Sequence, residues 1–140
     1  ELSDKIKLIP RVKMHQEVYN IMAHADCGIF PSRAEGWNLE LLEMLACGKQ
    51  VITTDYSAHS AFCNKENALL VDIADKETAY DGKWFNGKCG KWAKIGDNEK
   101  EQFIEHLRYV HGNKKYNRKG VETAEKFNWR NTAKCIINNV

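Results

Sequence analysis

The sequence has no long hydrophobic run, no strong net charge and no repeat, and each absence excludes a class of protein. No apolar stretch approaches the ~20 residues that a membrane-spanning helix needs. Lys and Arg total 21 against 19 for Asp and Glu, a net charge of +2. This near balance gives no argument for nucleic acid or an anionic membrane as the main partner. There is also no internal repeat and no low-complexity tract.

The five cysteines include no C-x-x-C pair. Cys27 and Cys47 lie in apolar segments, so we interpret them as buried thiols of a reducing compartment rather than as disulfides or metal ligands. This interpretation predicts a cytoplasmic location, with no metal and no cofactor. No signal peptide is visible, but a sequence that begins within a longer protein would not show one.

The 140 residues, 43% of them hydrophobic, are enough for one domain with a single core. Short apolar or β-branched runs predict strands, and apolar residues at helical spacing predict helices. Strands that alternate with helices indicate an α/β fold with a parallel sheet, whose strand-to-helix loops share one edge. We expect strands at residues 5–10, 27–30, 50–54 and 68–73, with helices at 14–24 and after residue 38.

The pattern changes after residue 73. Residues 81–92 are rich in glycine and aromatic residues without a period, which indicates an ordered surface excursion. Three helices are expected to follow: one around residues 103–110, one at 114–126, and a last one capped by Asn128. We expect Trp84, Trp92 and Trp129 to be packing residues, and Trp37 to be either a packing or a binding residue.

Residues 34–43 organise the chain, because they place two glutamates, Glu35 and Glu43, around a predicted helix start. Asn38 is a good N-cap residue, so the helix should begin at Leu39, and Gly48 should follow its last turn. The helix has almost no polar face and is expected to be buried. Unpaired backbone N–H groups at its start favour an anion. Carboxylates beside an anion site suit a nucleotide-sugar, which has hydroxyls on both sides of a diphosphate.

The same stretch resembles a known family. The matching residues are Pro31-Ser32, Glu35-Gly36, Glu43, Ala46-Cys47-Gly48 and Val51-Ile52-Thr53. Together they are similar to the E-x7-E region of retaining glycosyltransferases of the GT-B fold. The resemblance runs from about residue 6 to residue 140, and it covers the later part of that family's C-terminal domain. It implies a Rossmann-like parallel sheet with flanking helices and a donor site that needs no tightly bound metal.

The resemblance also implies roles for the motif residues. Glu35 would contact hydroxyls of the donor sugar as the catalytic candidate, and Glu43 would accept hydrogen bonds from the ribose. The alternative for Glu43 is a salt bridge to Lys or Arg, because a lone carboxylate on an apolar helix is costly. The backbone N–H groups of Asn38, Leu39 and Glu40 are candidates for the diphosphate, against ordinary helix capping. Relatives have small or apolar residues where Asn38 and Glu40 stand, so the Glu40 side chain is expected to point away.

Two further segments carry candidates. Arg11 and Val12 follow the first predicted strand, where relatives touch the nucleobase through backbone groups; an ordinary surface loop is the alternative. His59 lies in a loop that relatives place near the donor, so it is either a phosphate ligand or a surface histidine. Many relatives have a glutamate near Ala61, and this chain does not. The other four histidines show no ligand spacing and are expected to be structural.

The resembling domain normally begins with a strand and an Arg–Lys pair that neutralises the leaving diphosphate, and neither precedes Ile6. The acceptor-binding domain is absent too. We therefore expect the missing N-terminal part, or a second chain, as a partner, and no sugar transfer by these residues alone. The predicted function is the donor-binding part of a retaining glycosyltransferase that acts on an acceptor hydroxyl of a sugar, lipid or protein. The alternatives are a non-catalytic nucleotide-binding or interaction module that keeps the fold and, less favoured, a sugar epimerase.

Overall fold

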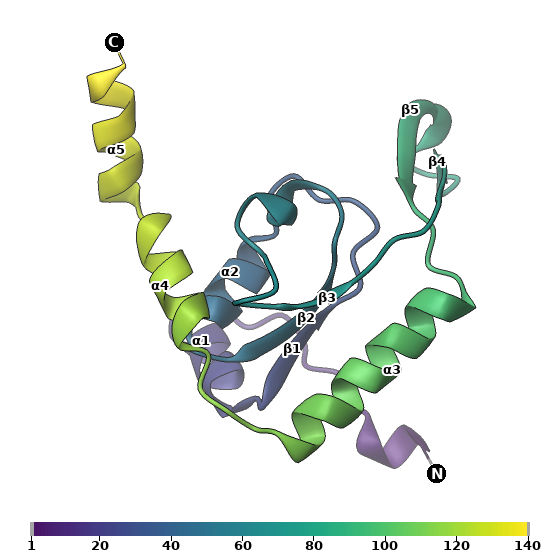
Figure 1. Cartoon of the computed structure of the whole chain (residues 1–140), viewed down its shortest axis with the longest axis horizontal. Coiled ribbons are helices and arrows are strands. Elements are labelled where there is room, and N and C mark those ends of the chain that lie inside the picture. The colour runs from purple at the N-terminus through teal and green to yellow at the C-terminus, as the bar shows by residue number, and fades with distance from the viewer. Residues whose placement is uncertain (1, 140) are drawn as a thin grey trace.

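The computed structural model describes residues 2–139 and has a three-stranded parallel sheet at its centre (Figure 1). The strands are β1 (Cys27–Phe30), β2 (Gln50–Thr54) and β3 (Leu69–Val71), in the order β1-β2-β3. Gly28 is paired with Val51, and Ile52 with Leu69. The α/β class with a parallel, Rossmann-like sheet and flanking helices is therefore confirmed.

Helices surround the sheet, and a separate antiparallel hairpin follows it. The helices are α1 (His15–His24), α2 (Leu39–Ala46), α3 (Asp97–Gly112), α4 (Arg118–Lys126) and α5 (Trp129–Asn138), with short 3-10 turns η1 (Leu2–Lys5) and η2 (Ala58–Ala61). The hairpin consists of β4 (Lys76–Tyr80) and β5 (Asn86–Ala93). In Figure 1 it stands away from the sheet, and α5 extends away on the other side.

The central strand β2 explains the layering, because all five of its residues are buried and successive side chains point to opposite faces. Val51 belongs to a core with Leu41 of α2, whereas Ile52 belongs to a second core with Phe103 of α3. Helix α2, with α4 packed against it, thus covers one face of the sheet, and α3 covers the other (Figure 1). The continuous burial of β2 is typical of a parallel strand covered on both faces.

Helix α2 begins and ends as predicted but buries only one of its faces. Leu41 and Leu45 have no exposed surface, whereas Leu39 is 61% exposed. The prediction of a buried helix holds only for the face that carries Leu41, Met44 and Leu45, which belong to the core with Val51 of the sheet. Gly48 follows the helix with φ +68°, a left-handed conformation that suits glycine. A Cβ on Gly48 would also lie 2.1 Å from the ring of Tyr116.

The predicted strand at residues 5–10 is absent. Residues 6–12 form neither helix nor strand, and the apolar side chains of Ile6, Leu8 and Ile9 are 66%, 91% and 50% exposed. Alternating polarity predicts a strand only where another strand pairs with it, and the described sheet ends at β1. Strand β3 is also shorter than the predicted 68–73.

Other differences lie in the second half of the chain. The 81–92 stretch is the turn and second strand of a hairpin that periodicity did not reveal. Trp84 is 75% exposed and Trp129 is 88% exposed, so their prediction as packing residues is wrong. Trp92 does pack, with its ring centroid 5.5 Å from that of Phe85. Helix α4 begins at residue 118 rather than 114, where the Asn117 side chain accepts a hydrogen bond from the Gly120 N–H.

Candidate functional site

The loops that follow β1 and β2 are joined by direct hydrogen bonds. The Ser57 hydroxyl donates to the backbone carbonyl of Glu35 at 2.8 Å and accepts from the backbone N–H of Glu35 at 2.7 Å. The Thr54 hydroxyl donates to the Ser32 carbonyl at 2.7 Å. These contacts place the motif loop against the 55–60 loop at the carboxyl edge of the sheet, where ligands bind in open α/β folds.

Glu35 is half-buried in this pair of loops. The Ser32 hydroxyl donates a hydrogen bond to its Oε1 at 2.7 Å, which directs one carboxylate oxygen and leaves Oε2 without a hydrogen bond from any residue between 2 and 139. The backbone of Glu35 is fixed on both sides by Ser57. The carboxylate is thus oriented and still has acceptor capacity for a hydroxyl donor.

The start of α2 lies next to this carboxylate. Asn38 is 5% exposed and adopts a left-handed conformation with φ 69°, and its Oδ1 accepts from the Leu41 N–H at 3.2 Å. Asparagine tolerates this conformation better than most residues, which gives a physical reason for a small or amide residue here. Within residues 2–139, nothing accepts a hydrogen bond from the backbone N–H of Asn38, Leu39 or Glu40. These unpaired N–H groups and the helix dipole favour an anion.

Glu43 lies one turn further along α2, with an exposed side chain. It lines a cavity of about 280 Å³ between α1 and α2, together with the apolar and aromatic residues His15, Val18, Tyr19, Met22, Ala46 and Cys47. No Lys or Arg within residues 2–139 forms an ion pair with Glu43, so the salt-bridge alternative is wrong. The cavity offers one carboxylate on an otherwise apolar wall, as many small-molecule sites do.

His59 has no exposed surface, so its interpretation as a surface histidine is wrong. Its Nε2 lies 2.6 Å from the Thr54 carbonyl oxygen and 3.1 Å from the Thr53 hydroxyl. Its Nδ1 is buried and has no hydrogen-bond partner in the described part of the chain. The ring therefore holds the end of β2, and a phosphate contact by His59 would require the 55–60 loop to move.

Arg11 and Val12 are not joined to this site by any hydrogen bond or ion pair of the described residues. Arg11 is exposed and Val12 is half-buried, in the irregular segment before α1. Their predicted nucleobase contact stays a prediction, but it no longer follows from a preceding strand.

Ser57, Ser32, His15 and Tyr19 were not predicted as site residues. Ser57 has φ 79° and ψ −161°, a conformation that is costly for any residue except glycine and that tends to occur at functional sites. No sequence pattern reveals such strain. Ser32 was part of the motif, but its bond to Glu35 depends on the loop conformation. His15 and Tyr19 reach the cavity because α1 packs beside α2, a tertiary contact that periodicity does not give.

Arg33 attaches the β4–β5 hairpin to the loop that carries Glu35. Its Nε donates to the Ala93 carbonyl at 2.9 Å, its guanidinium lies 4.0 Å from the centroid of Trp92, and it pairs with Glu77. The Ala93 N–H donates back to the Arg33 carbonyl at 2.8 Å. On the other side of the motif, Trp37 packs against the rings of Phe62 and Phe127, which directly follow η2 and α4, so it is a packing residue.

Comparison with known proteins agrees with this architecture. A sequence model of the family described as glycosyl transferases group 1 matches residues 1–82, which contain the sheet, α2 and both motif glutamates. The chain therefore belongs to this family, and it is a glycosyltransferase, an enzyme class that moves a sugar from a donor to an acceptor. No curated protein matches the chain. Within residues 2–139, no helix has the length and apolar character that a membrane crossing needs.

Proposed function

We propose that this chain binds a nucleotide-sugar at the start of α2 and forms the donor half of a retaining glycosyltransferase site. In this assignment Glu43 accepts hydrogen bonds from the ribose hydroxyls. The N–H groups of Asn38, Leu39 and Glu40 bind the diphosphate. Glu35 contacts hydroxyls of the donor sugar. The base occupies the apolar cavity beside Glu43, where Tyr19 offers an aromatic wall.

The chemistry requires stabilisation of a departing diphosphate. When the bond from the anomeric carbon to the diphosphate breaks, negative charge accumulates on the phosphate oxygens, and preorganised N–H donors stabilise it without reorganising. The acceptor hydroxyl then bonds to the anomeric carbon on the same face, with loss of its proton. Glu35, whose backbone is held by Ser57, would orient the sugar during this step.

A single observation carries the proposal. Two carboxylates without salt bridges flank a helix start whose first N–H groups have no partner in the described structure. Because neither carboxylate is engaged by a cation of the described chain, their acceptor oxygens are available to a ligand. The family membership supports the same assignment, since glycosyl transfer needs a sugar donor.

The first prediction concerns Glu43→Ala. Removing a charged hydrogen-bond acceptor should weaken nucleoside diphosphate binding by about 1.5–3 kcal/mol, which is roughly ten- to a hundredfold in affinity. Titration calorimetry on the folded variant measures this. Glu105→Ala is the control, because it removes an exposed carboxylate from α3, which has no assigned role in the donor site. Unchanged affinity in Glu43→Ala would remove Glu43 from the ribose role.

A further inference from the structure

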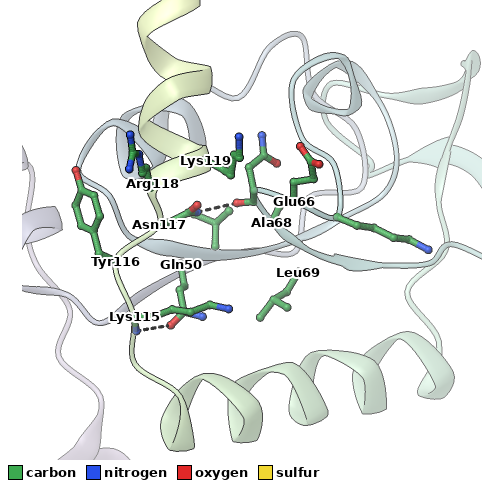
Figure 2. Close-up of a pocket in the computed structure, with 12 residues that line it drawn as sticks. Gln50, Glu66, Ala68, Leu69, Lys115, Tyr116, Asn117, Arg118 and Lys119 are labelled. Carbon is green, nitrogen blue, oxygen red and sulfur yellow. Dashed lines mark hydrogen bonds between the residues drawn. The ribbon is translucent and has the colours of Figure 1, made fainter.

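A second cavity lies at the opposite, amino edge of the sheet, where β2 and β3 begin. It has a volume of about 280 Å³ and lies between the start of α4, the 65–69 segment and the chain that leads into α4 (Figure 2). Gln50 and Leu69, the first residues of their strands, form part of its floor. Because parallel strands begin at one edge and end at the other, this cavity is separate from the site at Glu35 and Glu43.

The charges around the cavity are mostly positive. Lys65, Lys115, Arg118 and Lys119 line it, and Glu66 is the only acidic residue among its lining residues. Arg118 and Lys119 are partly neutralised by Glu122, at 3.2 and 3.0 Å. Lys65 and Lys115 form no ion pair within residues 2–139; the Lys115 Nζ lies 3.5 Å from the Tyr109 hydroxyl and 5.8 Å from the centroid of that ring. The lining therefore has a net positive charge with two uncompensated ammonium groups.

A buried amide contributes an unused donor. The Gln50 side chain is only 5% exposed, and its Oε1 accepts from the Lys115 N–H at 3.1 Å (Figure 2). No residue between 2 and 139 accepts a hydrogen bond from its Nε2, although that side chain lines the cavity. Because Gln50 lines the cavity, this amide can donate to a bound ligand that accepts hydrogen bonds. The neighbouring Asn117 differs, because its Nδ2 donates to two backbone carbonyls.

The start of α4 adds backbone donors. Asn117 caps the helix through Gly120, whereas the N–H groups of Arg118 and Lys119 have no partner in the described chain. The dipole of this nine-residue helix adds partial positive charge at the same end. Ammonium groups, a buried amide donor and a helix start thus meet around one cavity.

From these features we propose that the cavity binds a phosphate group of a small anionic ligand, at a site distinct from the donor site. A phosphate offers several acceptor oxygens and up to two negative charges, which match the Gln50 Nε2, the two N–H groups and the lysines. Glu66 lies at the rim and selects against ligands with a second anionic group near it.

Nuclear magnetic resonance of the 140-residue chain tests this proposal directly. Inorganic phosphate and glycerol 3-phosphate are titrated at constant ionic strength, with sodium chloride as the blank. The proposal expects saturable shifts of the Gln50 side-chain amide and of the Arg118 and Lys119 backbone amides. The Gln102 side-chain amide, which donates to the Asp72 carbonyl and does not line the cavity, should not shift. Vesicles of phosphatidylcholine with phosphatidic acid form a second arm that identifies a lipid phosphate as the source.

Two variants keep the test independent of folding and of the donor site. Lys65→Ala with Lys115→Ala should weaken phosphate binding about three- to tenfold, since both side chains are exposed and neither holds the core. The matched control, Lys126→Ala with Lys134→Ala, removes the same charge from other exposed positions and should leave affinity unchanged. Glu43→Ala should also leave the phosphate affinity of this cavity unchanged, whereas it should lower the affinity of the proposed donor site for a nucleoside diphosphate.

Three results would overturn the proposal. The first is no saturable Gln50 shift with either phosphate compound or with the acidic vesicles. The second is an equal loss of affinity in the two lysine pairs. The third is a set of amide shifts confined to Leu39 and Glu40, which would mean that phosphate binds only at the proposed donor site and not in this cavity.

Discussion

The strand and helix unit from β1 to β3 and the chain that follows it are organised differently. The first unit holds the fully buried large side chains: Leu41, Leu45, Val51, Ile52, Thr53, Thr54, His59 and Val71. The later chain includes a two-stranded hairpin and the terminal helix α5. No residue of α5 is buried, and both Trp84 and Trp129 are exposed. Glu35, Glu43 and the start of α2 lie in the first unit, and the family match to residues 1–82 spans it. Precise positioning of ligand groups therefore coincides with dense packing, and the later chain is attached to it by local contacts such as those of Arg33.

The sharpest test of this difference compares Leu41→Ala with Trp129→Ala. Leu41 is fully buried in the core between α2 and the sheet, so its truncation should lower the free energy of unfolding by about 2–5 kcal/mol. Trp129 is 88% exposed, and its truncation should change stability by less than about 0.5 kcal/mol. Chemical denaturation monitored by circular dichroism measures both. A loss in Trp129→Ala as large as that in Leu41→Ala would mean that α5 is packed as tightly as α2.

Gly48 offers a smaller effect at the point where the two regions meet. Gly48→Ala forces a side chain into a left-handed conformation, which should cost about 1–2 kcal/mol of stability. It also pushes against the ring of Tyr116, just ahead of α4. Thermal unfolding of Gly48→Ala and of the double variant with Tyr116→Ala separates the two causes, because the second change removes only the clash. Gly36→Ala is the control, since a Cβ there meets nothing within 4 Å. Equal stability of Gly48→Ala and wild type would contradict the assigned conformation.

Ser57→Ala should have a small effect on stability and a selective effect on binding. Losing the two hydrogen bonds to the Glu35 backbone should cost about 1 kcal/mol. Because Glu35 is assigned to the sugar, affinity for the nucleotide-sugar should fall by about fivefold, while affinity for the bare nucleoside diphosphate stays unchanged. Ser60→Ala, which removes a hydroxyl of the same loop that does not bind Glu35, serves as the comparison in calorimetry. Parallel losses for both ligands in Ser57→Ala would show that Ser57 does not act through Glu35.

Where local chemistry decides the structure, the sequence predicted it correctly. Asn38 caps α2, Asn128 caps α5 through the Asn131 N–H, and Gly48 ends α2 in a left-handed conformation. The strands at 27–30 and 50–54 followed from their apolar and β-branched composition. These features depend on neighbours a few residues away.

The sequence alone did not predict the features that depend on contacts with distant segments. The alternation at residues 5–10 is typical of a strand, yet no strand pairs with it in the described chain. The ring of the buried His59 contacts the Thr53 hydroxyl and the Thr54 carbonyl. Trp84 lies in the turn of the hairpin, where its side chain is exposed to solvent. The strained backbone of Ser57 follows from its bonds to Glu35, 22 positions earlier, which no pattern reveals.

The most direct test of the donor-site assignment is calorimetry of Glu35→Gln with a nucleotide-sugar and with the matching nucleoside diphosphate. The substitution keeps the size and a hydrogen-bonding oxygen for Ser32, but removes the charge that would bind the sugar hydroxyls. If Glu35 reaches only the sugar, the variant should bind the nucleotide-sugar roughly tenfold more weakly and the diphosphate as tightly as wild type. Equal losses for the two ligands, or no loss for either, would contradict the assignment.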